Sequence, residues 1–371
     1  MRVTILLRIC WTGGAQKIAI NQALALQDLG HSVRLLFLRE GDSKGYSELL
    51  EPLNVEMFRC RRNRVEQAIY DVLTHLFAPD RGRESTIDLD LMRLCTRSLE
   101  RNPPDLLICH DQFSALAGMY ANLRLAIPFS VYLHERPDNF ALPFLSNIVL
   151  AVQKIALSRA RAIYGVTDQV TKQASDVYGM PVRTLSPGLR DHEGPPYLSR
   201  EKQIIAVSMW DAGRKPLIYL DILDRLPGYK LCMAGNWRIP SLRLEFESAT
   251  RRRGLVDRVS IRTALSEEDL IAEYRRSRFA IRLGFGEFGP GLAALEAVET
   301  QTPPVVNNGI GAARLLNESG AGIVVEGEDV NEIAKRIRLA DNESAYVGFQ
   351  AAERGLISRF SWTAHAKELC A

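Results

Sequence analysis

The chain has 371 residues, of which 46% are hydrophobic and 25% are charged, and its formal net charge is +3. This length favours two domains, each large enough to bury its own core. The composition excludes a small disulfide-stapled scaffold, a disordered chain, a collagen and a strongly basic nucleic-acid binder.

The six cysteines are scattered without a CxxC pair, which favours neither a zinc site nor a disulfide framework and is typical of a reducing compartment. The first ten residues lack the small-residue cleavage site of a signal peptide. The most apolar stretch, residues 142–157, is interrupted by polar side chains. We therefore expect a cytoplasmic protein without a metal site, whose contact with a membrane is at most peripheral.

Short β-branched or leucine-rich runs alternate with longer amphipathic segments in the first half of the chain. The expected strands are residues 3–9, 33–37, 106–109, 129–133 and 162–166. This alternation is typical of βαβ units on a parallel sheet. It predicts a doubly wound, Rossmann-like α/β domain over residues 1–190.

A polar stretch with prolines, residues 191–200, predicts a surface linker. A second α/β series follows, with expected strands at residues 203–207, 229–233, 259–261, 279–283, 304–307 and 322–325. It predicts a second Rossmann-like domain over residues 201–371, and we expect its last helix to pack back on the first domain. Two such domains in tandem predict a ligand cleft at the carboxyl ends of their sheets.

A glycine pair follows the first expected strand. Gly13 and Gly14 lie between that strand and the first helix, where backbone N–H groups can approach an anionic ligand. A tight turn is the commoner origin of such a pair. The dinucleotide fingerprint GxGxxG is absent here, which argues against a nicotinamide-dependent dehydrogenase.

A second glycine-rich segment gives the stronger signal. Residues 284–291 contain four glycines and a proline directly after an apolar strand, and a helix is expected to begin near Leu292. Free N–H groups at this helix start would face the ligand cleft, with Glu296 in the first turns. The Glu296 carboxylate could accept hydrogen bonds from sugar hydroxyls or merely complement the helix dipole.

This segment resembles the retaining glycosyltransferases of family 4, which have the GT-B fold of two facing Rossmann-like domains. Glu287-Phe288-Gly289 and the Leu-Glu-Ala around Glu296 are similar to two motifs of that family. Eight residues separate the two glutamates, one more than in the family. Weaker similarities run along nearly the whole chain, at residues 13–16, 29–33, 160–167, 185–188, 235–236, 268–274 and 303–309.

The resemblance implies a donor site for a nucleotide sugar. Glu296 would hold the ribose of the nucleotide, and Glu287 would contact the hydroxyls of the donor sugar. Amides of the glycine loop would serve the sugar and the diphosphate. The donor-binding residues implied in this way are Gly13, Gly14, Arg214, Lys215, Gly235, Glu287, Phe288, Gly289, Gly291, Leu292 and Glu296.

The family binds the donor diphosphate with a basic pair that follows the first strand of the second domain. Met209 stands where the family has an arginine. Lys215, with Arg214 as a substitute, is therefore the candidate for stabilising the leaving diphosphate. A solvated basic turn is the alternative.

Histidines follow two expected strands of the first domain. His110 and Asp111 come after residues 106–109 and His134 comes after residues 129–133, so both histidines should lie at the carboxyl edge of the sheet. Either could instead be a core or capping residue. The resemblance implies that His134 acts beside the reacting carbon. It implies Glu287 and Lys215 as further catalytic residues. It also implies that His110 and Asp111 lie on the acceptor side.

The string that begins at Asp111 also resembles mannosyltransferases that extend lipid-linked oligosaccharides, which supports mannose weakly. A basic, partly apolar segment in the first domain could rest on an anionic membrane and collect a lipid-linked acceptor, although a solvated face explains it as well. Its residues are Arg59, Arg61, Arg62, Arg64, Arg81 and Arg83, with Ile69, Val72, Leu73, Leu76 and Phe77. It lacks the aromatic platform of an RNA-binding surface.

We therefore expect a retaining, metal-independent hexosyltransferase that uses a GDP- or UDP-linked sugar and a glycan or lipid-linked acceptor, with no further cofactor and no nucleic-acid partner. A UDP-sugar 2-epimerase on the same fold is one alternative, and it would convert the nucleotide sugar without an acceptor. A degenerate binding protein is another, suggested by Met209 and the longer glutamate spacing.

Overall fold

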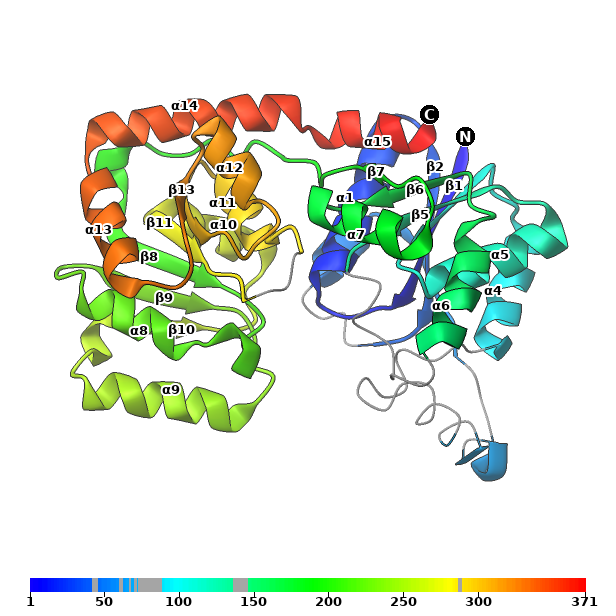
Figure 1. The fold of residues 1–371 in the computed structure, drawn as a ribbon, viewed down its shortest axis with the longest axis horizontal. Coiled ribbons are helices and arrows are strands. Elements are labelled where there is room, and N and C mark those ends of the chain that lie inside the picture. The colour runs from blue at the N-terminus through cyan, green and yellow to red at the C-terminus, as the bar shows by residue number, and fades with distance from the viewer. Residues whose placement is uncertain are drawn as a thin grey trace. The chain divides into compact units, whose positions relative to one another are not determined.

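The computed structural model describes residues 1–41, 46–59, 63–66, 68, 69, 72, 89–135, 146–285 and 289–371. The chain divides into two compact units, which we call unit 1 and unit 2 (Figure 1). Unit 1 consists of Met1–Pro187 together with Trp362–Ala371, and unit 2 consists of Gly188–Ser361.

Unit 1 is a parallel seven-stranded sheet with the strand order β3-β2-β1-β4-β5-β6-β7. Its strands are β1 (Arg2–Ile9), β2 (Ser32–Arg39), β3 (Asn54–Met57), β4 (Leu106–His110), β5 (Phe129–Leu133), β6 (Ala162–Gly165) and β7 (Arg183–Thr184). Its described helices are α1 (Gly14–Asp28), α2 (Ser47–Leu50), α4 (Leu89–Arg101), α5 (Ser114–Leu125), α6 (Ser146–Leu157), α7 (Asp168–Tyr178) and α15 (Trp362–Cys370).

Unit 2 is a parallel six-stranded sheet with the order β10-β9-β8-β11-β12-β13. Its strands are β8 (Glu201–Val207), β9 (Lys230–Ala234), β10 (Val259–Arg262), β11 (Ser277–Arg282), β12 (Pro304–Asn307) and β13 (Ile323–Val325). Its helices are α8 (Leu217–Asp224), α9 (Pro240–Arg252), α10 (Glu267–Arg276), α11 (Leu292–Glu299), α12 (Ala313–Ser319), α13 (Val330–Ala340) and α14 (Glu343–Arg359), with short 3₁₀ turns η4 (Tyr197–Ser199), η5 (Ala212–Arg214) and η6 (Val256–Arg258).

These sheets confirm the expected pair of Rossmann-like α/β units. Every expected strand is present, because the central strands are mostly apolar: β4 and β5 are buried at all five positions, as parallel strands covered on both faces require. The structure adds β3 and β7 at the two edges of the unit 1 sheet. Sequence analysis missed both because they are short and no residue of either strand is fully buried.

The stretch expected as a linker, residues 191–200, is part of unit 2 instead. Arg200 is 3% exposed, and its guanidinium donates to the Gln301 carbonyl (2.8 Å) and to Thr302 Oγ1 (2.7 Å). It donates further to the carbonyls of Pro195, Tyr274, Ser277 and Thr300. A buried cation must keep such partners, so these bonds fix the stretch to its own unit.

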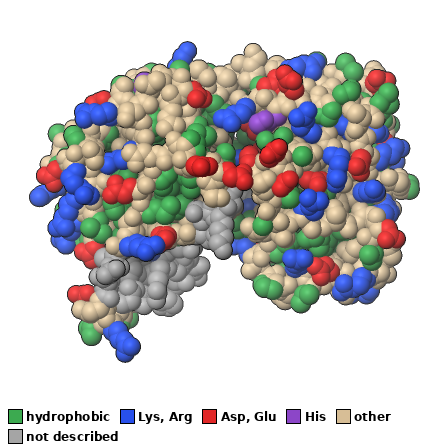
Figure 2. Space-filling model, turned by 180° about the vertical axis from the view of Figure 1, so that it is seen from behind, with side chains coloured by type: hydrophobic (Ala, Val, Ile, Leu, Met, Phe, Trp, Pro, Cys, Tyr) green, Lys and Arg blue, Asp and Glu red, His purple; other side chains and the backbone are tan. Residues whose placement is uncertain are grey.

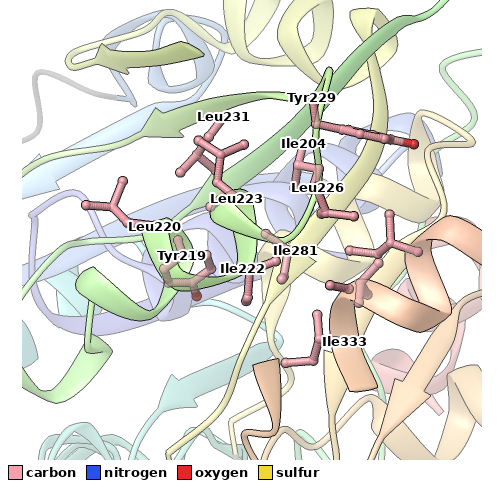
Figure 3. Close-up of a cluster of buried hydrophobic side chains, with 14 of the residues drawn as sticks. Ile204, Tyr219, Leu220, Ile222, Leu223, Leu226, Tyr229, Leu231, Ile281 and Ile333 are labelled. Atoms are coloured by element: carbon pink, nitrogen blue, oxygen red, sulfur yellow. The ribbon is translucent and has the colours of Figure 1, made fainter. Parts of the chain in front are cut away.

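The core of unit 2 lies between its sheet and helices α8 and α13 (Figure 3). Ile204 of β8, Ile281 of β11, Leu220 and Leu223 of α8 and Ile333 of α13 belong to one cluster of buried side chains. Close packing of this kind holds a helix in one place. It therefore also fixes the turn that enters α8, which carries two of the predicted cations.

Positively and negatively charged side chains are intermixed over the described residues on the face shown in Figure 2, in line with the net charge of +3. In the described part of the chain, no helix combines the length and the apolar character that crossing a bilayer requires.

Glu353 of α14 is a buried carboxylate that lacks a hydrogen bond. It is fully buried, and neither of its oxygens has a hydrogen-bond partner among the described residues. Burial raises the pKa of Glu353 well above its usual range, and the charges of Arg200 and Arg354 offset this only in part. The folded chain therefore holds a proton that the unfolded chain releases once the pH exceeds about 4.5.

This linkage predicts that Glu353→Gln stabilises the protein more as the pH rises. Because the pKa of Glu353 is raised on folding, wild-type stability should fall by up to about 1.4 kcal/mol per pH unit above the carboxyl's ordinary pKa. Glu353→Gln removes that fall. We expect its advantage in the free energy of unfolding, measured by urea denaturation, to be larger at pH 7 than at pH 5.

Glu318→Gln, at an exposed glutamate of α12, is the control and should change stability by less than about 0.5 kcal/mol. An advantage of Glu353→Gln that is the same at both pH values would show that Glu353 is ionised in the folded protein.

Candidate functional site

The carboxyl ends of β1, β4 and β5 lie next to one another in the unit 1 sheet, because these strands are parallel neighbours in the order β1-β4-β5. The glycine turn follows β1, His110 ends β4, and His134 follows β5. This edge of unit 1 therefore carries the donor- and acceptor-side candidates of the first domain: Gly13, Gly14, His110, Asp111 and His134.

Gly13 caps α1, and Gly14 is the first residue of that helix. A Cβ atom on Gly13 would lie 2.7 Å from Gln16 Oε1 and 3.0 Å from Trp11 Nε1, so a larger residue there would have to displace these two side chains. The Gly13 carbonyl also accepts a hydrogen bond from Tyr46 Oη (3.0 Å). The first N–H groups of α1 remain suited to an anion, as at other helix starts.

His110 and His134 contact each other directly. His110 Nδ1 and His134 Nε2 are 2.8 Å apart, and the two rings stack with centroids 5.0 Å apart. The side chains are buried, at 1% and 7% exposure. Burial lowers the pKa of His134 to about 3 and that of His110 well below its usual range. Both imidazoles are therefore neutral near pH 7.

Gln22 and His365 complete this buried polar cluster, and sequence analysis missed both. Gln22 Oε1 lies 2.7 Å from His110 Nε2, and Gln22 Nε2 lies 2.9 Å from His365 Nε2. His365 Nδ1 lies 2.8 Å from the Ser186 carbonyl. A glutamine inside the apolar stripe of α1 was the available sequence signal, because buried polar side chains require partners.

Asp111 stabilises a turn at the same edge. Its Oδ1 accepts hydrogen bonds from the N–H groups of Phe113 and Ser114, both at 2.8 Å, and its φ of 79° lies in the left-handed region. Loss of water around the carboxyl raises the pKa of Asp111, and the charge of Arg8 opposes that effect. The residue thus shapes the turn between β4 and α5.

In unit 2, Arg214 and Lys215 lie in the turn between β8 and α8. Lys215 Nζ forms an ion pair with Glu328, at 2.7 and 2.8 Å from the two carboxylate oxygens, and lies 4.6 Å from the centre of the Phe285 ring. Burial lowers the pKa of Arg214 to about 10, and the nearby charge of Arg282 adds to this effect. Arg214 keeps its positive charge at neutral pH.

Arg282 is a further cation that sequence analysis missed. It is the last residue of β11, 8% exposed, and directly precedes the loop that contains the predicted donor motif. The charge of Arg282 is one of the causes that lower the pKa of Arg214. A charged residue at the end of an otherwise apolar strand was the available signal.

The described ends of the glycine-rich loop are fixed to the last residue of β12 and to the segment that follows it. Asn307 Nδ2 donates to the Gly284 carbonyl (2.9 Å), and Asn307 Oδ1 accepts from the Gly284 N–H (2.7 Å). The Gly311 N–H donates to the Gly289 carbonyl (2.9 Å). Glu287 and Phe288 lie outside the described residues, so their predicted roles remain predictions.

α11 begins at Leu292, as expected, after Gly291 with a φ of 68°. Glu296 lies half-buried on this helix, and its Oε2 is 3.1 Å from Tyr274 Oη. The same hydroxyl lies 3.0 Å from the Ala293 carbonyl. Tyr274 is buried, at 1% exposure, and it therefore holds the Glu296 carboxylate close to α11. Sequence analysis missed Tyr274 as a site residue.

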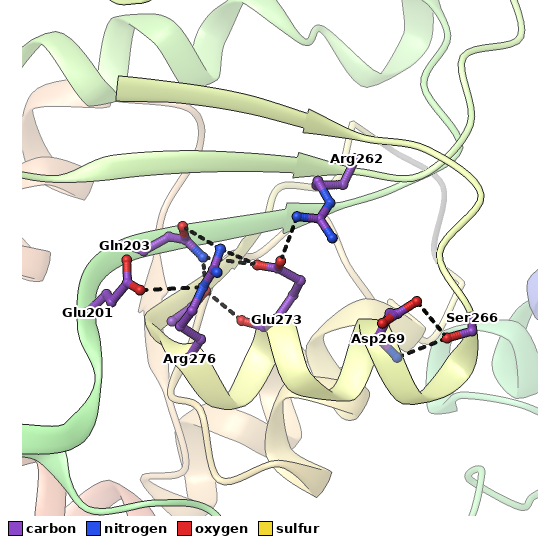
Figure 4. Close-up of polar contacts among 8 residues, drawn as sticks. Glu201, Gln203, Arg262, Ser266, Asp269, Glu273 and Arg276 are labelled. Atoms are coloured by element: carbon purple, nitrogen blue, oxygen red, sulfur yellow. Dashed lines mark hydrogen bonds and ion pairs between the residues drawn. The ribbon is translucent and has the colours of Figure 1, made fainter. Parts of the chain in front are cut away.

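Helix α10 presents Tyr274 and is itself held firmly (Figure 4). Ser266 caps its start, where Ser266 Oγ accepts from the Asp269 N–H (3.1 Å). On the other side, Glu273 is paired with Arg262 (3.3 Å) and Arg276 (2.9 Å). These contacts connect α10 to the sheet and so position Tyr274.

Gly235 has a packing role. Its φ is 109°, and a Cβ atom there would collide with the Ser208 carbonyl. The close approach lets Trp210 and Trp237 pair in a short parallel bridge. A direct contact of Gly235 with a donor remains a prediction.

Most of the predicted basic segment lies outside the described residues: Arg61, Arg62, Arg81, Arg83, Leu73, Leu76 and Phe77. Of the remainder, Arg59 is paired with Glu40, while Ile69 and Val72 are 57% and 60% exposed. Within the described ranges, no three His, Cys, Asp or Glu side chains form a metal-binding group. Membrane contact and metal independence stay predictions.

Two family profiles match the chain. The one described as Glycosyltransferase Family 4 matches residues 12–192, and the one described as Glycosyl transferases group 1 matches residues 218–347. The first match begins after β1 and runs through unit 1 to the first residues of unit 2. The second match lies within unit 2.

Curated relatives match shorter parts. A GDP-mannose:cellobiosyl-diphosphopolyprenol alpha-mannosyltransferase from Xanthomonas oryzae pv. oryzae is 28% identical over 144 residues, 38% of this chain and 37% of the relative. A D-inositol 3-phosphate glycosyltransferase from Mycolicibacterium smegmatis is 28% identical over 192 residues, 50% of this chain and 43% of the relative. The chain thus matches less than half the length of either relative.

Solved structures match the whole chain. HepE from Anabaena, in complex with UDP and glucose, has a TM-score of 0.77 at 16% identity, covering 100% of this chain and 98% of that chain. Sucrose-phosphate synthase from Thermosynechococcus elongatus has a TM-score of 0.74 at 14% identity, with the same coverage. These likenesses show the GT-B fold. The two profiles identify a Glycosyltransferase Family 4 region over residues 12–192 and a Glycosyl transferases group 1 region over residues 218–347.

Proposed function

We propose that the protein is a retaining glycosyltransferase that transfers mannose from GDP-mannose to a lipid-linked glycan. The observation that carries this proposal is the arrangement after β8 and β11 in unit 2. There, the described ends of a glycine-rich loop are fixed by hydrogen bonds and the loop leads into α11, and the Glu296 carboxylate accepts from Tyr274. The turn before α8 and the end of β11 carry Arg214, Lys215 and Arg282.

This arrangement fits the chemistry of a nucleotide diphosphate sugar. The bond between the sugar carbon and the diphosphate oxygen breaks, and the acceptor oxygen bonds the same carbon from the same face. The acceptor's proton passes to the departing diphosphate. Negative charge grows on the diphosphate, and the cations Arg214, Lys215 and Arg282 would stabilise it. The Glu296 carboxylate would accept hydrogen bonds from the two ribose hydroxyls.

The ion pair of Lys215 with Glu328 fits this role. Both side chains are partly exposed, at 51% and 37%, and an exposed pair of this kind is weak. A diphosphate, with a larger negative charge than one carboxylate, would compete effectively for Lys215. Donor binding would therefore replace Glu328 as the partner of the ammonium group.

Unit 1 would supply His134 for the donor sugar and the surface for the acceptor, as the family resemblance implies. A lipid-linked acceptor also requires contact with the membrane that holds it. Ile69 and Val72 have exposed side chains and follow several arginines in the sequence, which supports such a contact.

The mannosyltransferase relative supports GDP-mannose as the donor. HepE, whose structure contains UDP and glucose, favours a UDP-linked sugar as the second candidate. The two bases are distinguished directly by binding.

We predict that GDP and GDP-mannose raise the melting temperature of the protein, because a ligand that binds only the folded state adds about 2.7 kcal/mol of stability at a hundredfold excess over its Kd. Glu296→Gln should weaken GDP binding by about ten- to a hundredfold, since it removes charged hydrogen-bond acceptors. Tyr274→Phe should also weaken GDP binding, by a smaller factor. Calorimetry with each variant measures both changes.

Glu268→Gln, at an exposed carboxylate of α10, is the control for these variants. A shift with UDP and none with GDP would change the proposed donor. Conversion of a UDP-sugar without acceptor would identify the epimerase, and the absence of any nucleotide binding would refute the proposed function.

The family has an arginine at the position of Met209. We further predict that Arg282 supplies the positive charge that is missing there. Arg282→Met should weaken GDP binding by at least about tenfold and leave GMP binding nearly unchanged, because the cation acts on the terminal phosphate. Introducing Met209→Arg into this variant should restore part of the lost affinity. Competition of GDP and GMP for a fluorescent nucleotide measures the ratio.

Arg336→Met removes an exposed arginine of α13 in the same unit, at 51% exposure, and should leave the ratio as in the wild type. An equal loss of GDP and GMP affinity in Arg282→Met would mean that Arg282 supports the fold and not the diphosphate.

A further inference from the structure

Four side chains of unit 1 form one continuous row of hydrogen bonds, which we call the histidine wire: His134, His110, Gln22 and His365, ending on the Ser186 carbonyl. Its four contacts, from His134 to Ser186, measure 2.8, 2.7, 2.9 and 2.8 Å. Each side chain is buried, with exposure between 0% and 7%. No position in the wire can therefore exchange its partner for water.

The Ser186 end fixes the direction of the wire. A carbonyl oxygen only accepts hydrogen bonds, so His365 must carry a proton on Nδ1. Burial lowers the pKa of His365 to about 4, so the ring is neutral and its Nε2 is an acceptor. The Gln22 amide nitrogen donates to that atom. The amide oxygen of Gln22 consequently faces His110.

The remaining protons follow from Gln22. Its amide oxygen accepts, so His110 must carry its proton on Nε2. In the neutral ring, His110 Nδ1 is then an acceptor, and His134 must donate to it from Nε2. The lone pair of His134 is thereby left on Nδ1, an atom for which no hydrogen bond to a described residue is found.

Packing holds the rings of the wire in their orientation. Tyr132 lies 5.1 Å from His134 and 5.7 Å from His365 between ring centroids, and its hydroxyl is anchored on the Leu185 carbonyl at 2.6 Å. Trp362 covers His365 at 5.1 Å. Reversing the wire would turn a nitrogen lone pair toward the Ser186 carbonyl, with two acceptors in contact.

We propose that Gln22, His110 and His365 are positioning residues that hold His134 with its proton on Nε2 and its lone pair on Nδ1, ready to accept a hydrogen bond from a hydroxyl of the donor sugar. This inference rests on the proposed function for its substrate. His134 would thus serve as a neutral acceptor that orients the sugar. It would not donate a proton to the leaving group.

The wire is tested first in the ligand-free protein, by ¹⁵N NMR of the full chain labelled at histidine. The chain has six histidines, so each signal can be assigned by single substitution. We expect His134 and His110 to be neutral with the proton on Nε2, and His365 to be neutral with the proton on Nδ1. A proton on Nδ1 of His134, or a charged His134 at pH 7, would overturn the proposal.

The positioning role is tested by comparing two substitutions of His365. Gln retains an acceptor for Gln22 and a donor for Ser186, whereas Leu has neither. We expect His365→Leu to reduce kcat for turnover of GDP-mannose at least tenfold, to leave the Kd for GDP within twofold of wild type, and to give His134 a mixture of tautomers. His365→Gln should restore most of the rate.

His31→Leu is the matched control, because His31 also contacts α15, at Cys370 Sγ (4.0 Å), but lies outside the wire. Unchanged kcat in His365→Leu would overturn the positioning role while the proposed function stands. Failure of the wild type to bind any nucleotide sugar would refute the proposed function instead, and the tautomer of His134 would still decide whether the wire exists.

Discussion

In both sheets every paired strand runs parallel to its neighbours, and this constraint determines where polar groups collect. Parallel strands send their carboxyl ends to one edge, and helices cover both faces, so polar side chains at that edge must satisfy one another. In unit 1 the histidines after β4 and β5 do so through Gln22 and His365. In unit 2 the amide of Asn307 pairs with both backbone groups of Gly284.

The two units satisfy this constraint with opposite electrostatics. Burial keeps the imidazoles of His110, His134 and His365 neutral, so these side chains offer directed hydrogen bonds without a charge of their own. In unit 2 the turn before α8 and the end of β11 carry the cations Arg214, Lys215 and Arg282. Neutral hydrogen-bonding groups suit sugar hydroxyls, and cations suit a diphosphate.

Sequence patterns predicted the central strands, the start of α11 and the position of both histidines, because each depends on local features: apolar runs, glycines and strand ends. The partners of those residues could not be predicted in this way. Gln22 and His365 are 343 positions apart, and Tyr274 reaches Glu296 from a different helix. Edge strands β3 and β7 were missed because four and two residues are too few to form a clear apolar run.

The placement of α15 has a consequence for how the chain matures on the ribosome. Unit 2 is one continuous stretch, Gly188–Ser361, whereas unit 1 needs Trp362–Ala371 as well. In Figure 1 α15 lies alongside elements of unit 1, and it brings His365 to Gln22. During translation unit 1 therefore lacks α15 and His365 until all of unit 2 has been synthesised, so unit 2 is the first of the two units whose sequence is complete.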